Sequence, residues 1–138
     1  MKKLSEGQLE ELRQMAAVYG LKGWHFHKDS RGFVIITREG IERIQSHLKM
    51  RVEFEPVHEW SDADKGRYVI AAKAWIVDGE KHMVSMSYGE VTANNNKTGY
   101  PVAMAEKRAL SRVVLKLAGM YQLGVYGEDE VDTKDPGQ

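Results

Sequence analysis

The chain has 138 residues, no cysteine, and 20 basic residues balanced by 20 acidic ones. This length is typical of one domain with its own core, and the lack of cysteine excludes disulfides, thiolate catalysis and cysteine-based zinc sites. No apolar run approaches the roughly 18 residues that cross a bilayer, and the N-terminus lacks the apolar core of a signal peptide. We therefore expect a cytoplasmic protein with no membrane partner.

The first part of the chain predicts two helices separated by a β-hairpin. Ser5 and Gln8 fit a capping box at the start of an amphipathic helix. Two short strands, residues 24–27 and 33–37, follow on either side of a turn. Thr37 can cap a second helix, whose apolar stripe indicates that one side is buried.

Three longer strands come next, at about residues 51–60, 67–77 and 80–91. Asp78-Gly79 between the last two is a strong two-residue hairpin signal, so these strands are expected to be antiparallel. The predicted fold class is α+β. It consists of an antiparallel sheet, made of the β-hairpin and a three-stranded meander, with helices packed on one face.

Charge is distributed unevenly along the chain although the formal net charge is zero. Residues 128–135 carry a net charge of −4, which leaves +4 on the rest. We expect a single domain at residues 1–127, followed by an acidic, flexible tail at 128–138. Such a tail is commonly just a solvated chain end. The alternative is that it competes with nucleic acid for a basic groove.

The last predicted helix, residues 99–119, carries a line of positive charge. Arg108, Arg112 and Lys116 are spaced i, i+4 and i+8, which aligns them on one side of the helix, while apolar residues repeat along another. A row of this kind is typical of a phosphate-binding surface. The alternative is an ordinary solvated basic face, favoured by the negative end of the helix dipole.

No catalytic constellation is recognisable. The chain has no P-loop, no dinucleotide-binding fingerprint and no Gly-x-Ser-x-Gly nucleophile elbow. His25 and His27 lie on one side of a predicted strand and could share a metal ion, but no further ligand is indicated by the spacing. We therefore expect a protein that is not an enzyme, with no metal site and no cofactor.

Residues 105–119, Ala-Glu-Lys-Arg-Ala-Leu-Ser-Arg-Val-Val-Leu-Lys-Leu-Ala-Gly, resemble the final core helix of single-strand annealing proteins. That group includes the eukaryotic recombination mediator of the Rad-fifty-two type and its phage relatives. The family helix reads Ala-x-x-Arg-Ala-x-x-Arg-Ala-Leu and is followed by glycine. The matching positions are Ala105, Arg108, Ala109, Arg112 and Gly119. Val113 stands where alanine is more usual, and the shared order of elements extends the resemblance over about residues 33–127.

The resemblance implies a β-β-β-α core that assembles into a homo-oligomeric ring or filament. It also implies single-stranded DNA binding and strand annealing in homologous recombination or repair. The DNA backbone would lie in a basic groove with the bases turned outward, no nucleotide cofactor would be used, and a phage or prophage origin with a nuclease or recombination partner is expected. The DNA-binding residues carried over by position are Arg108, Arg112 and Lys116, with Lys107 and Lys97 as weaker candidates and Arg51 and Lys73 as strand cations without a secure match.

Other functions stay open from the residues alone. A double-stranded RNA-binding module has a similar order of elements, although its lysines cluster at the start of the final helix. An α+β protein could instead hold a small ligand in a pocket between sheet and helix. A partner-binding scaffold without nucleic acid is the third alternative.

Overall fold

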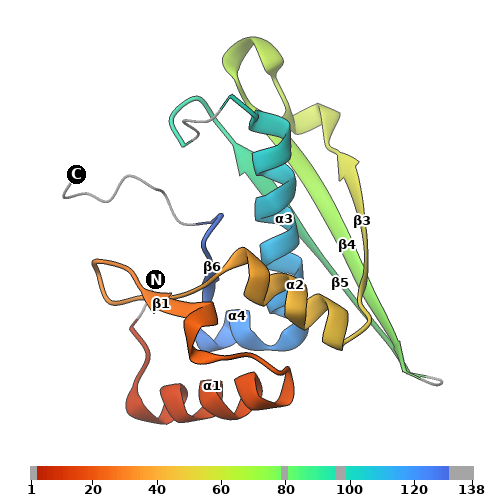
Figure 1. The fold of residues 1–138 in the computed structure, drawn as a ribbon. Helices are drawn as coiled ribbons and strands as arrows, with labels where there is room; N and C mark the ends of the chain where they lie inside the picture. The colour runs from red at the N-terminus through yellow and green to blue at the C-terminus, as the bar shows by residue number, and fades with distance from the viewer. Residues whose placement is uncertain (1–2, 79–80, 96–98, 131–138) are drawn as a thin grey trace.

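The computed structural model describes residues 3–78, 81–95 and 99–130, which form an α+β fold (Figure 1). Its helices are α1 (Glu6–Val18), α2 (Arg38–His47), α3 (Pro101–Ala118) and α4 (Met120–Leu123). Its strands are β1 (Phe26–Lys28), β2 (Val34–Ile36), β3 (Arg51–Pro56), β4 (Tyr68–Asp78), β5 (Lys81–Val91) and β6 (Tyr126–Gly127). Single 3-10 turns occupy residues 23–25, 58–60 and 63–65.

The predicted N-terminal caps are confirmed. The Ser5 hydroxyl accepts a hydrogen bond from the Gln8 amide, and the Gln8 side chain accepts one from the Ser5 amide, which completes the capping box of α1. The Thr37 hydroxyl accepts from the Gly40 amide at 3.1 Å and begins α2. The strand expected at 24–27 is confirmed only for residues 26 and 27, which belong to β1. Residues 23–25 form a 3-10 turn, in which the Lys22 amide donates to Nδ1 of buried His25.

The hairpin and the meander are both present, but they belong to two separate sheets. One sheet has the order β1-β2-β6 and the other the order β3-β4-β5. β6 pairs with β2 in parallel, a contact that the sequence analysis did not predict. A two-residue strand is too short to show a hydrophobic period, so only the packing of the folded chain reveals it.

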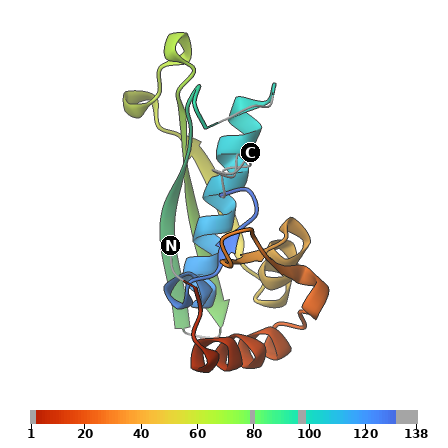
Figure 2. The same cartoon turned by 90° about the vertical axis from the view of Figure 1, so that its left-hand side faces the viewer.

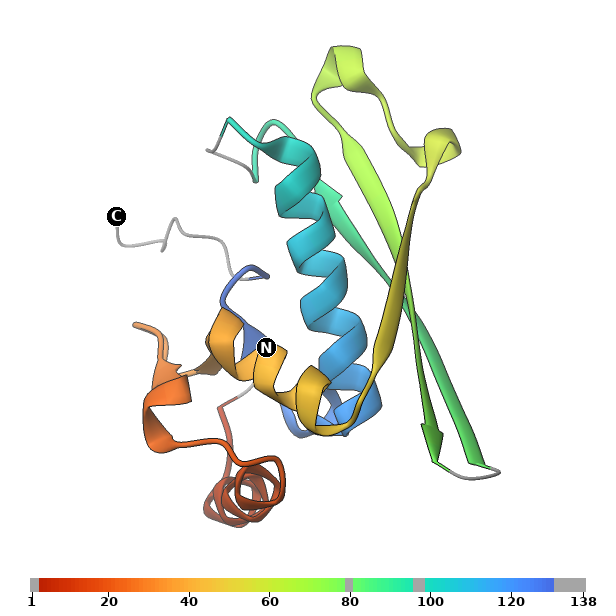
Figure 3. The same ribbon diagram turned by 45° about the vertical axis from the view of Figure 1, so that its right-hand side comes forward.

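The meander sheet has one covered and one uncovered face. On β4, residues at alternate positions from Ile70 to Ile76 are buried under α3, and the helices all lie on that side of the sheet (Figure 2). Among the described residues, no α-helix lies over the opposite face (Figure 3). β3 is shorter than the expected strand 51–60, because the chain leaves the sheet at Pro56 and enters the 3-10 turn at 58–60.

α3 lies directly on β5, so no groove separates the two. Ala105 and Ala109 are fully buried where the helix passes Gly89. A Cβ atom built on Gly89 would overlap the Ala105 carbonyl oxygen and the Ala109 amide nitrogen. The helix backbone can approach this closely only because residue 89 has no side chain. α3 ends at Gly119, whose φ of +80° forms the left-handed cap.

The start of the expected acidic tail is part of the fold. The Glu128 amide donates to the Ile36 carbonyl at 3.0 Å, and the Glu128 carboxylate accepts from the Arg38 amide at 2.7 Å. The domain boundary expected at residue 127 therefore falls inside a packed segment, and residues 131–138 of that tail lie outside the described residues. In the described part of the chain, no helix is both long and apolar enough to span a membrane.

Candidate nucleic-acid interface

The three cations of α3 project toward the outer edge of β5. Lys116 Nζ donates to the Met86 carbonyl at 3.0 Å and Arg112 Nη1 to the Tyr88 carbonyl at 3.1 Å. Arg108 Nη1 donates to the Glu90 carbonyl at 2.9 Å. We term Arg108, Arg112 and Lys116 the edge row.

The spacing of the edge row matches the repeat of the strand that it covers. Four residues of an α-helix rise about 6 Å, and two residues of a strand span about 6.6 Å. Alternate carbonyls along a strand point to the same side, so a helix that runs beside an edge strand can place every fourth side chain at every second carbonyl. The spacing that predicted a line of charge is therefore also the spacing that covers a strand edge.

Arg108 joins three segments of the chain. Besides the Glu90 carbonyl, its guanidinium donates to the Asn95 backbone carbonyl at 2.7 Å and to the Asn95 side-chain oxygen at 3.0 Å. Its Nε donates to the Asp129 carbonyl at 2.8 Å. The end of β5, the loop after it and the C-terminal segment are thus held by one half-buried side chain, which gives Arg108 a structural role.

Arg112 forms an ion pair with a buried carboxylate. Its Nε lies 2.9 Å from Glu130 Oε1, and the exposed side-chain fractions are 41% for Arg112 and 4% for Glu130. The other Glu130 oxygen accepts from the Gly127 amide at 2.9 Å. Burial raises the pKa of Glu130 above its ordinary value, although the Gly127 amide and the Arg112 guanidinium act in the opposite direction.

The remaining predicted site residues are not brought into the edge row. Lys107 is exposed on α3, one position before Arg108 and off the line of the edge row. Arg51 and Lys73 lie on the uncovered face of the sheet, at positions paired with Trp75 and Glu53. Lys97 lies outside the described residues. The structure therefore leaves Lys107 off the line of the edge row and places Arg51 and Lys73 on a different face of the sheet.

An exposed aromatic pair lies on the uncovered face of the sheet. The rings of Trp60 and Tyr88 meet edge to face with centroids 5.1 Å apart, and the carbonyl of the same Tyr88 binds Arg112. Trp60 and Tyr100 are both exposed. The contact of Trp60 with Tyr88 was not predicted, because it depends on the turn at 58–60 that returns the chain toward β5.

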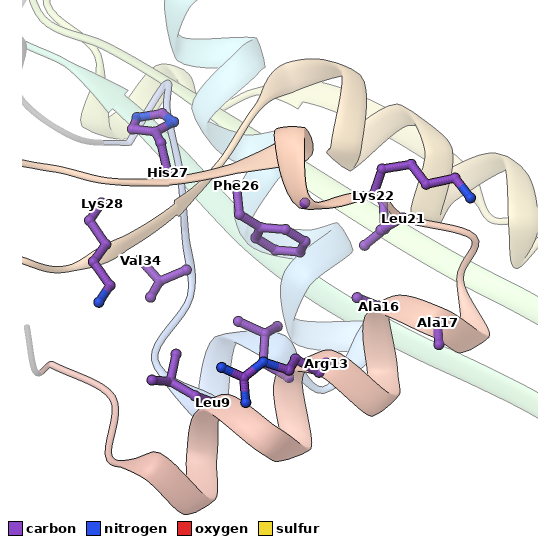
Figure 4. A pocket seen from close by; sticks show the side chains of 12 residues that line it. Leu9, Arg13, Ala16, Ala17, Leu21, Lys22, Phe26, His27, Lys28 and Val34 are labelled. Atoms are coloured by element: carbon purple, nitrogen blue, oxygen red, sulfur yellow. The ribbon is translucent and has the colours of Figure 1, made fainter.

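An apolar pocket lies away from the meander sheet. It has a volume of about 440 Å³ and lies between α1 and β1 (Figure 4). Leu9, Ala16, Phe26 and Val34 contribute apolar walls, and the lining also includes the cations Arg13, Lys22 and Lys28. A pocket between sheet and helix was one of the alternatives left open by the sequence. This pocket lies between α1 and the smaller sheet, whereas α3 packs directly on β5 at Gly89.

The two histidines considered as metal ligands are not arranged as a pair. His25 is buried in the 3-10 turn, with Nδ1 bonded to the Lys22 amide, whereas His27 is exposed on β1. Among the described residues, no group of three or more histidine and carboxylate side chains could hold a metal ion.

Comparison of the chain with models of protein families, with curated proteins and with solved structures finds no match.

Proposed function

We propose that the protein binds single-stranded DNA along the edge row and anneals complementary strands as an oligomer, in the manner of single-strand annealing proteins. It would act in the cytoplasm in recombination or repair of phage or prophage origin, without a cofactor or a catalytic step. The observation that supports this best is the edge row itself, a line of three cations along the outer edge of β5. The order β3, β4, β5, α3 agrees with the β-β-β-α core that the sequence resemblance implies.

The charges of the edge row are suited to sequence-independent binding. The hydrogen-bond partner of Lys116 is a neutral carbonyl, so that contact leaves its positive charge uncompensated. Arg112 is 41% exposed despite its ion pair, and Lys107 adds a further exposed cation. Phosphate contacts fix a strand in place without reading its bases, which is what annealing of any complementary pair requires. A few such contacts are weak at physiological salt, so several copies along one strand are needed.

The aromatic pair favours a single strand over a duplex. Trp60 and Tyr88 present exposed ring surface on the uncovered face of the sheet, and the Tyr88 carbonyl is bound by Arg112 of the edge row. Aromatic side chains stack on unpaired bases of any sequence. Bases inside an RNA or DNA duplex are already stacked on each other. A double-stranded RNA-binding function therefore leaves this part of the surface unused.

Binding measurements separate these functions. We would measure the fluorescence anisotropy of labelled oligo-dT, an RNA duplex and a DNA duplex between about 50 and 200 mM salt. The proposed function predicts tightest binding to oligo-dT, a steep loss of affinity with salt, and faster annealing of two complementary oligonucleotides. Equal or tighter binding to the RNA duplex would favour the double-stranded RNA alternative, and no binding to any of the three would exclude nucleic acid as the ligand.

A small apolar ligand is the second candidate, and the pocket between α1 and β1 favours it. Its volume lies in the range of ordinary ligand sites. Anilinonaphthalene sulfonate, an aromatic anion, can serve as the probe. If the pocket binds it, Ala16→Phe should fill the space and reduce probe fluorescence several-fold while oligo-dT binding stays unchanged. If the probe fluoresces equally with Ala16→Phe and with the parent chain, this pocket is not where the probe binds.

A further inference from the structure

The two edges of the meander sheet differ in how their backbone groups are satisfied. The β5 edge is covered by the edge row, as described above. The β3 edge has no neighbouring strand in the described part of the chain, and five of its six residues are exposed. An edge strand with free amides and carbonyls is a ready partner for another strand.

The register shows which groups of β3 are free. The Met86 and Tyr88 carbonyls point away from β4, so these two residues form no backbone hydrogen bonds with the β4 residues opposite them. Those opposite residues are Lys73 and Ala71, and their backbone groups therefore point toward β3. On β3, Glu53 lies opposite Lys73 and Glu55 lies opposite Ala71, so the backbone groups of these two glutamates form hydrogen bonds with β4. The backbone groups of Val52 and Phe54 point outward, and no described residue bonds to them.

We propose that β3 pairs antiparallel with β3 of a second copy of this chain, in a register centred on Glu53. In this register Val52 of one copy and Phe54 of the other exchange two backbone hydrogen bonds, and symmetry repeats the exchange. The same register places Arg51 opposite Glu55 of the second copy, twice. The pairing uses all five residues from 51 to 55.

The side chains of β3 are self-complementary in this register. On the α3 side of the sheet, half-buried Val52 meets Phe54, which is 37% exposed in one chain and is covered by the contact. On the other side, each Arg51 faces a carboxylate. Only Glu53 meets its own counterpart, and Lys73 lies directly beside each of them on β4. A register centred on Phe54 would instead place Glu53 opposite Glu55 twice, which like-charge repulsion disfavours.

The result is a closed two-fold dimer with one six-stranded sheet. A symmetric interface uses the same strand from both copies, so no free β3 edge remains. The outer edges of the extended sheet are the two β5 strands, and each is covered by its own edge row. The sheet therefore stops growing at two copies. This self-complementary charge pattern fits a second copy better than a strand of unrelated sequence, and the pairing requires no nucleic acid.

Charge exchange tests the pairing and its register. Arg51→Glu and Glu55→Arg each place like charges opposite one another in the homodimer, whereas an equimolar mixture of the two variants restores both pairs. In sedimentation velocity the parent chain should be dimeric. Each variant alone should dissociate at least about tenfold more readily, and the mixture should dimerise as the parent does. Circular dichroism would show that both variants stay folded. A monomeric parent, or a mixture no more dimeric than its components, would overturn the proposal.

A cysteine cross-link provides a second test, because the natural chain has no cysteine. In the proposed register, the two copies of residue 53 form a directly opposed pair that exchanges no backbone hydrogen bonds. The Cα atoms of such a pair are about 4.5 Å apart, which is within the range of a disulfide. The two copies of residue 52 lie diagonally, at about 7–8 Å. Glu53→Cys should therefore form a covalent dimer under mild oxidation and Val52→Cys should not. Cross-linking of Val52→Cys alone, or of neither variant, would reject the register.

Discussion

Arg112 donates a hydrogen bond from Nη1 to the Tyr88 carbonyl at 3.1 Å and so covers one of the outward carbonyls of β5. Arg108 and Lys116 do the same for the carbonyls on either side. An uncovered edge strand invites unwanted pairing with other chains, and charged side chains are one of the means by which proteins prevent it. The cations assigned to nucleic acid by sequence thus also protect the edge of the sheet. The two roles are compatible where the side chain keeps exposed surface.

Gly89→Ala should prevent stable folding of the meander against α3. The added methyl group would overlap the Ala105 carbonyl oxygen and the Ala109 amide nitrogen, both of which belong to a rigid helix backbone. We expect a loss of about 3 kcal/mol or more in the free energy of unfolding, measured by chemical denaturation. Gly23→Ala is the matched control, because nothing lies within 4 Å of its added Cβ. Equal stability of both variants would show that α3 does not approach β5 this closely.

Arg108→Met should be more destabilising than Lys107→Met, its neighbour on the same helix. Arg108 bonds to Glu90, Asn95 and Asp129, so its truncation leaves carbonyls in three segments without a partner. We expect Arg108→Met to lower the free energy of unfolding by about 2–3 kcal/mol. Lys107 is exposed, so Lys107→Met should lower the free energy of unfolding by no more than about 0.5 kcal/mol. Thermal and urea unfolding would measure both, and equal costs would contradict the structural role of Arg108.

Arg112 and Glu130 should be energetically coupled. Arg112→Met leaves a carboxylate that is only 4% exposed without its cation, so we expect a loss of about 1–3 kcal/mol. In the Glu130→Gln background, Arg112→Met should lower the free energy of unfolding by clearly less, because it leaves no buried charge without a partner. A double-mutant cycle gives the coupling energy. A coupling near zero would mean that the ion pair does not form in solution.

Glu130 should make the folded chain less stable as the pH rises above 4.5. Burial raises the pKa of Glu130 from its ordinary value of 4.5, so between that value and the raised pKa the folded state holds a proton that the unfolded state has lost. The stabilisation is therefore complete below about pH 4.5 and is lost as the pH rises through the raised pKa. Urea unfolding across this range should show a downward slope that Glu130→Gln reduces. If the slope of stability against pH is unchanged in Glu130→Gln, groups other than Glu130 cause the pH dependence.

The sequence predicted those parts of the fold that depend on local pattern. The Ser5 capping box, the Thr37 cap, the hairpin signal at Asp78-Gly79 and the helical spacing of the edge row all follow from neighbours within a few residues. The pairing of β6 with β2 could not be predicted, because it joins residues about 90 positions apart through two short strands. The separation of the hairpin and the meander into two sheets likewise depends on packing rather than on local pattern.

In the candidate site, too, the features set by local pattern were predicted and those set by packing were not. Spacing alone aligned Arg108, Arg112 and Lys116, but it contains no information on the strand that they face. Arg51 and Lys73 were assigned by residue type, and the pairing of β3 with β4 places them on the other face of the sheet. The buried carboxylate of Glu130 was assigned to a solvated tail because acidic runs are usually exposed. It faces Arg112 because β6 brings residues 126 and 127 beside β2.

The salt dependence of oligo-dT binding tests the central claim most directly. Lys107→Gln with Lys116→Gln removes two exposed cations of α3, one of them in the edge row. Lys22→Gln with Lys28→Gln removes two exposed cations beside the distant pocket as a matched control. Each phosphate contact to a single strand contributes about 0.7 to the slope of log affinity against log salt. We predict that the first pair of substitutions lowers that slope by about 1.4 and weakens binding, while the control pair leaves both unchanged. Equal affinity and slope in the two double variants would show that DNA does not bind along the edge row.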